Sequence, residues 1–77
     1  MRVYVALVED RRTSTEVRVF AGMDESIRWA RRIARESSPT GEVAEMSDDD
    51  LAGAEWLYCA TYSDGNRVRV VQVEVVA

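Results

Sequence analysis

Residues 24–36 read DESIRWARRIARE, and this stretch decides the fold. At about 100° per residue, its apolar side chains fall on one side of a helix and its guanidinium groups on another. The apolar side consists of Ile27, Trp29, Ala30, Ile33 and Ala34. The basic stripe consists of Arg28, Arg31, Arg32 and Arg35, which follow i, i+3, i+4, i+7 spacing. We therefore predict an amphipathic helix with Asp24 as its N-cap, running to about Glu36 and lying on a sheet.

The segments on both sides of this helix are β-branched or aromatic and alternate along the chain, which predicts strands. The expected strands cover residues 2–8, 16–21, 56–62 and 67–76. Residues 9–15 contain no apolar side chain and form a loop, and the Asp64-Gly65 pair favours a tight hairpin. The expected fold is α+β, β-β-α-β-β, with a four-stranded antiparallel sheet, one helix on one face, and a single domain over residues 1–77.

Residues 42–55 are acidic and interrupt this simple order. Ser47 followed by three aspartates is typical of a capped helix start, because acidic side chains favour the first helical turn. We predict a short acidic helical turn over Asp48–Ala54, which Gly53 limits in length. The sequence leaves open whether this segment docks on the arginines, and it leaves the strand order open as well.

The sheet has more apolar surface than one helix can cover. Both faces of the first strand are apolar, and the last strand slips in phase at Val70–Val71, which indicates a bulge or burial on both sides. In the third strand Trp56, Tyr58 and Tyr62 share a face. Because something must cover the second face, we expect a homodimer. The three aromatic residues are expected in the core or on the dimer or partner face of the sheet, and a stacking platform for bases is the alternative.

The composition argues against an enzyme. All ten basic residues are arginine, and without histidine the usual general base and commonest metal ligand are absent. Without lysine there is no Schiff-base chemistry. We expect no catalytic residue, no cofactor and no metal, since the aspartate run lacks calcium-loop spacing and Cys59 lies among apolar neighbours. A single cysteine and no long apolar run predict a cytoplasmic protein that does not enter a membrane.

The arginine stripe is the leading candidate for a binding surface. Its planar guanidinium groups suit carboxylates and phosphates, although a merely solvated helix face gives the same pattern. The net charge of −4 weighs against general nucleic-acid binding. The leading hypothesis is a non-catalytic protein-interaction or regulatory module that binds an acidic partner. The alternative is a phage-type inhibitor or nucleic-acid-associated regulator that uses the same arginines on phosphate.

Three runs carry a resemblance to known sequences: VYVALVEDRRT at 3–13, EVRVF at 16–20 and WLYCATYS at 56–63. The chain resembles small uncharacterised actinobacterial proteins, including phage- and mobile-element-encoded ones. The resemblance implies the β-β-α-β-β order. It implies no activity and transfers no catalytic or binding residue.

Overall fold

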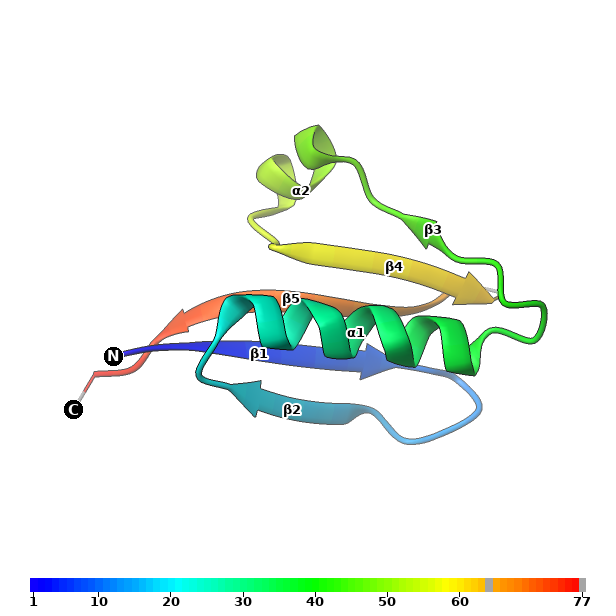
Figure 1. Cartoon of the computed structure of the whole chain (residues 1–77), viewed down its shortest axis with the longest axis horizontal. Coiled ribbons are helices and arrows are strands. Elements are labelled where there is room, and N and C mark those ends of the chain that lie inside the picture. The colour runs from blue at the N-terminus through cyan, green and yellow to red at the C-terminus, as the bar shows by residue number, and fades with distance from the viewer. Residues whose placement is uncertain (64, 77) are drawn as a thin grey trace.

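The computed structural model describes residues 1–63 and 65–76. Within them, helices α1 (Met23–Ser37) and α2 (Asp48–Ala54) accompany five strands (Figure 1). The strands are β1 (Arg2–Glu9), β2 (Glu16–Phe20), β3 (Ala44–Glu45), β4 (Tyr58–Ser63) and β5 (Asn66–Glu74). They form one antiparallel sheet in the order β2-β1-β5-β4-β3. The α+β class is confirmed, and so is α2 with its predicted bounds.

The expected four-strand sheet is wrong by one strand. β3 contains only Ala44 and Glu45, which pair with Thr61 and Ala60 of β4. Two residues are too few to show a period-two pattern in the sequence. The strand exists because β4 offers it an edge, and it ties the acidic segment to the sheet.

The first and last strands pair along the middle of the sheet. The β1–β5 register runs without a break from Arg2 opposite Glu74 to Glu9 opposite Arg67. The bulge considered at Val70–Val71 is therefore absent, and the irregularity lies between Thr61 and Ser63, near the hairpin that contains Gly65. Burial on both faces of β5 explains the phase slip instead. Val70 is buried under α1, and Val71 is half-buried on the opposite face. Asp64, on which part of the hairpin prediction fell, lies outside the described residues.

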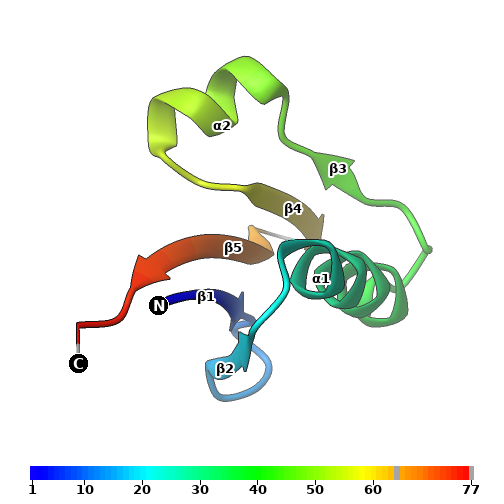
Figure 2. The same cartoon turned by 60° about the vertical axis from the view of Figure 1, so that its left-hand side comes forward.

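The core lies between α1 and the three strands β1, β5 and β4 (Figure 2). The predicted apolar side of α1 is confirmed: Trp29, Ala30 and Ala34 are buried, and Ile27 and Ile33 pack against the same cluster. Small residues stand at the contact, with Ala30 and Ala34 on the helix. Their short side chains let the helix approach the sheet closely.

The N-cap prediction for α1 is wrong. Gly22 is the N-cap residue, and it makes no side-chain capping bond. Helical hydrogen bonding already begins there, because the Ser26 amide donates to the Gly22 carbonyl oxygen. Asp24 lies instead in the first turn, where its charge favours the positive end of the helix. In α2 the Ser47 cap is confirmed, since its hydroxyl accepts a bond from the Asp50 amide.

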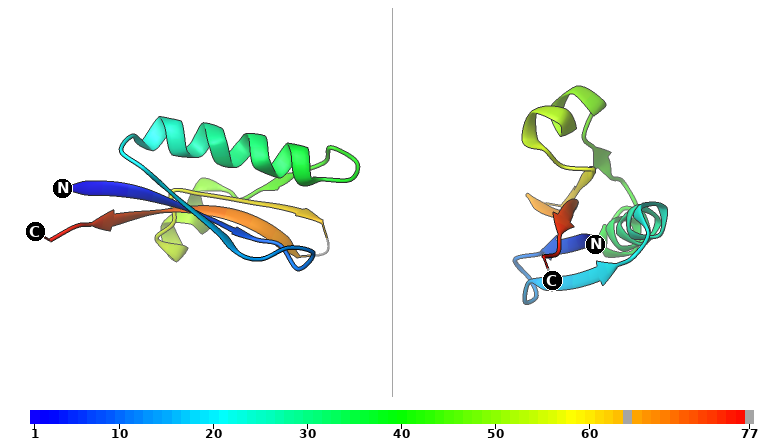
Figure 3. Two further views of the ribbon diagram at one scale, coloured as in Figure 1. Left: turned by 90° about the horizontal axis from the view of Figure 1, so that it is seen from below. Right: turned by 90° about the vertical axis from the view of Figure 1, so that its left-hand side faces the viewer.

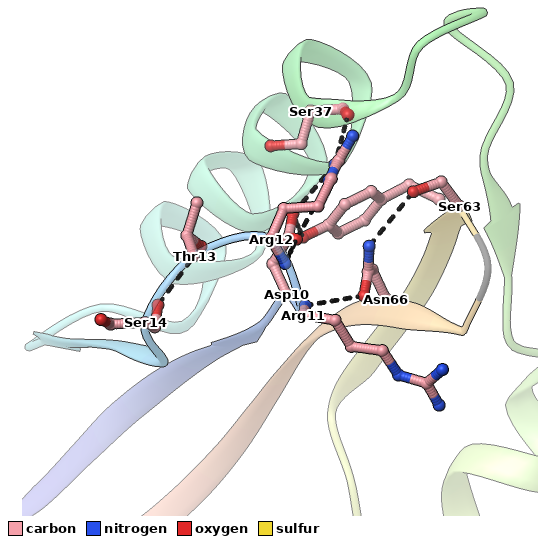
Figure 4. A network of polar contacts seen from close by, with 9 residues as sticks. Asp10, Arg11, Arg12, Thr13, Ser14, Ser37, Ser63 and Asn66 are labelled. Atoms are coloured by element: carbon pink, nitrogen blue, oxygen red, sulfur yellow. Dashed lines mark hydrogen bonds and ion pairs between the residues drawn. The ribbon is translucent and has the colours of Figure 1, made fainter.

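A buried carboxylate fixes the β1–β2 loop to the rest of the fold (Figure 4). Asp10 accepts bonds from the Arg12 amide and guanidinium, and from the Tyr62 hydroxyl at 2.8 Å. Arg12 also donates to the Ser37 carbonyl oxygen at the end of α1. The Arg12 hydrogen bonds hold the pKa of Asp10 well below its usual range. Burial, aided by the Asp10 carboxylate, raises the pKa of Tyr62 to about 12.

We predict that Asp10→Asn flattens the acid dependence of stability. Because the pKa of Asp10 is lowered in the folded state, the unfolded chain binds more protons once the pH falls below about 4. The stabilisation from this carboxylate is fully present above about pH 5 and is lost as the pH falls through the lower folded-state pKa. Urea unfolding from about pH 5 to pH 2 measures it. An equally steep decline in the variant would contradict the assignment.

Candidate interaction surfaces

The four arginines of the basic stripe are all exposed on α1, as predicted, but they are not equivalent. Arg31 is engaged within the chain: its Nε lies 3.0 Å from a carboxylate oxygen of Glu45 in β3. Its guanidinium also stacks 5.2 Å from the ring centre of Tyr58. The Tyr58 hydroxyl and the Arg31 guanidinium lower the pKa of Glu45. The acidic segment therefore reaches the stripe through β3.

In the described residues, the positive charges of the other three arginines are neutralised weakly or not at all by carboxylates of the same chain. The Nε of Arg32 lies 3.9 Å from a carboxylate oxygen of Glu36, and both side chains are about two-thirds exposed. An ion pair this long and this exposed contributes little to stability. Within the described part of the chain, Arg28 and Arg35 have no ion pair. These three guanidinium groups are consequently open to a carboxylate or phosphate from outside.

Arg18 extends this basic surface from the helix to the sheet. Its guanidinium lies 5.4 Å from the ring centre of Trp29. The ring centres of Phe20 and Trp29 are 5.7 Å apart. Phe20, Trp29, Arg28 and Arg32, with Glu25, line a shallow hollow of about 280 Å³ between α1 and β2. Sequence reasoning missed Arg18 as part of this surface, although the alternation of β2 does place it opposite Val17 and Val19.

The three aromatic residues predicted for an exposed sheet face are not brought together. Tyr58 and Tyr62 are buried in the core under α1, with exposures of 4% and 5%. Trp56 is half-buried away from them, stacked by the guanidinium groups of Arg67 and Arg69 at 5.2 and 5.0 Å. Of the predicted alternatives, Tyr58 and Tyr62 are core residues beneath the helix, and their assignment to a dimer or partner face is corrected.

The sheet face opposite α1 is aliphatic across β2, β1 and β5. Neither of the two helices in the described residues crosses it there (Figure 3). We call it the open face. It comprises Val3, Val5 and Leu7 of β1, Val17 and Val19 of β2, and Val71 and Val73 of β5. The register makes the patch continuous, because Val5 lies between Val19 and Val71. Val17 and Val19 are 57% and 60% exposed.

A charged cluster borders the open face toward β4. Glu9 of β1 lies 3.3 Å from Arg67 and 2.9 Å from Arg69, the two arginines that flank Trp56. One carboxylate is shared here by two guanidinium groups, so both arginines have an ion-pair partner but one positive charge is not neutralised. This charged cluster is therefore a boundary of the aliphatic patch.

The remaining chemistry of the chain is sparse. Cys59 is buried, and burial raises the pKa of its thiol, which disfavours the reactive thiolate. Residues 1–63 and 65–76 contain no cluster of potential metal ligands. Over the same residues, no helix is long and apolar enough to cross a membrane. No family model, curated protein or solved structure matches the chain.

We predict that Arg31 is the only member of the basic stripe with a clear effect on stability. Arg31→Ala removes the Glu45 pair and the Tyr58 stacking, and lowers the free energy of unfolding by about 0.5–1 kcal/mol. Arg28→Ala and Arg35→Ala change it by less than about 0.5 kcal/mol, because both side chains project into solvent. Chemical denaturation measures all three. Equal effects at the three positions would contradict the separation of the stripe into engaged and open arginines.

Proposed function

We propose that this protein is a non-catalytic interaction or regulatory module that acts as a homodimer and binds an acidic protein partner. The observation that carries the proposal is the continuous aliphatic open face. Apolar patches of this kind on small proteins mark interaction sites, and a chain of 77 residues alone buries only about 60% of its unfolded surface. A second copy would supply the missing cover.

The open face suits a two-fold contact with itself. In such a contact the same patch is used by both copies, so aliphatic side chains meet aliphatic side chains. The cluster around Glu9, Arg67 and Arg69 would stay at the rim, where its charges remain hydrated. Transfer of a valine from an exposed to a buried position contributes about 1.5–3 kcal/mol, and half-buried positions contribute correspondingly less.

The proposed dimer leaves the basic stripe accessible. α1 lies on the other side of the sheet, so both stripes would face outward on opposite surfaces of the pair. Arg28 and Arg32 lack strong internal partners and line the hollow beside β2, which favours an acidic ligand at that place, whereas Arg35 lies apart from it near Glu45. The cytoplasm remains the proposed compartment, on the ground of the single cysteine.

A nucleic-acid-associated regulator or phage-type inhibitor is the second candidate. The same three arginines would then contact phosphates, and binding would weaken steeply with salt. The net charge of −4 and the exposed aspartates of α2 favour the protein partner, because they repel a long polyanion.

For the dimer, we predict one species of twice the chain mass in size-exclusion chromatography with light scattering. Val19→Glu, at a 60%-exposed position of the open face, should weaken self-association at least about 100-fold, because a carboxylate would be buried without a partner. Val76→Glu is the matched control, since Val76 lies outside the sheet and is 89% exposed. A wild-type monomer at high micromolar concentration would remove the dimer from the proposal.

A further inference from the structure

We infer that the acidic partner binds as an extended strand that adds to the free edge of β2, with its carboxylates directed at Arg18, Arg28 and Arg32. The inference rests on the proposed acidic-partner function and specifies how that partner is recognised. It does not depend on the dimer, since a dimer formed through the open face leaves this edge unoccupied.

The edge of β2 is open and regular. Among residues 1–63 and 65–76, β2 is the terminal strand of the sheet and pairs with β1 alone, whereas the opposite edge strand, β3, has only two residues (Figure 1). The pairing of β2 runs without a bulge from Glu16 to Phe20, and no proline interrupts it. An edge of this kind presents backbone N–H and C=O groups that another extended chain can pair with.

The helix-facing side of this edge is basic around an apolar hollow. A strand added to β2 would lie about 4.8 Å beyond it, and alternate side chains would point to the side that α1 covers. There they would meet Arg18 of β2 and the open guanidinium groups of Arg28 and Arg32. Carboxylates at these positions would form charge-assisted hydrogen bonds.

The ligand side chain that enters the hollow is expected to be uncharged. Phe20 and Trp29 form its apolar lining, and Glu25 lies at the same place. A ligand carboxylate directly in the hollow would face Glu25, so we expect one apolar side chain there with carboxylates on either side. The ligand is thus acidic with an apolar anchor on its helix-facing side.

The other side of the added strand continues the open face. Its side chains would extend the row of Val17 and Val19, which favours β-branched residues. The ligand therefore alternates carboxylates and β-branched residues. A nucleic acid would satisfy the guanidinium groups but could not continue the backbone ladder, and this favours a polypeptide.

The basic stripe contains its own control. Arg35 is exposed and has no ion pair in the described residues, like Arg28, but it lies near Glu45 and does not line the hollow. Replacement of Arg35 by glutamine changes the net charge of α1 as much as replacement of Arg28 does. A difference in peptide affinity between the two variants therefore reports the position of the arginine and not the total charge of α1.

The test is calorimetric titration of the whole chain with a capped peptide of about eight residues that alternates glutamate and valine, with one glutamate replaced by leucine. The matched peptide carries N-methyl groups on alternate amides, which remove strand pairing along one edge and leave the charge unchanged. At about 150 mM salt, where charges beyond roughly 8 Å are screened, we expect the N-methylated peptide to bind at least tenfold more weakly. Arg28→Gln with Arg32→Gln should have a similar effect, and Arg35→Gln should stay within threefold of wild type.

Each outcome bears on a separate claim. Equal binding of both peptides would overturn edge pairing, and an equal effect of Arg35→Gln would overturn the location of the site beside β2. Both results would leave the acidic-partner function in place. Binding of neither these peptides nor polyglutamate would defeat that function itself. Tight, salt-sensitive binding of oligothymidylate without peptide binding would overturn the inference in favour of nucleic acid. Far-ultraviolet circular dichroism establishes that each variant is folded, and light scattering reports the dimer independently.

Discussion

The close packing of α1 on β1, β5 and β4 is the contact on which the rest of the structure depends. Ala30 and Ala34 of the helix are fully buried against strand residues such as Val68 and Val70. This contact fixes the rotation of α1 about its own axis. Because the arginines lie at other angles of the same helix, the packing alone directs them outward.

A single helix also determines what the sheet lacks. In the described residues α1 packs on one face of β1, β5 and β4, and α2, which has seven residues and no buried side chain, adds little to the core. Valine and leucine therefore remain on the open face, and β2 remains an uncovered edge. Both features arise because α1 is too small to cover the whole sheet. They leave the side of the molecule around β2 as the least covered part of the sheet.

The sequence predicts those parts of the fold that depend on local periodicity. The angular positions along α1, the Ser47 cap and the extent of α2 all follow from residues within one or two turns. β3 does not, because its two residues become a strand through β4. Arg18 joins the basic surface because α1 lies on its side of the sheet. Alternation along β2 does not show which side the helix covers.

Trp56 shows why the site prediction failed in part. Its backbone amide donates to the Leu51 carbonyl oxygen and closes the end of α2, after Glu55 has turned the chain in the left-handed region. The alternation that links Tyr58 to Tyr62 therefore does not extend back to Trp56. The surplus of apolar surface lies on the valines and Leu7 of the open face, whereas Tyr58 and Tyr62 lie under α1.

We propose that the open face is apolar because a second copy of the chain covers it. The most direct measurement is isotope-filtered nuclear Overhauser spectroscopy on an equimolar mixture of labelled and unlabelled chains. For the proposed dimer, we expect intermolecular contacts among the methyl groups of Val5, Leu7, Val19 and Val71. A rotational correlation time of a monomer, with no intermolecular contact from these methyl groups, would contradict it.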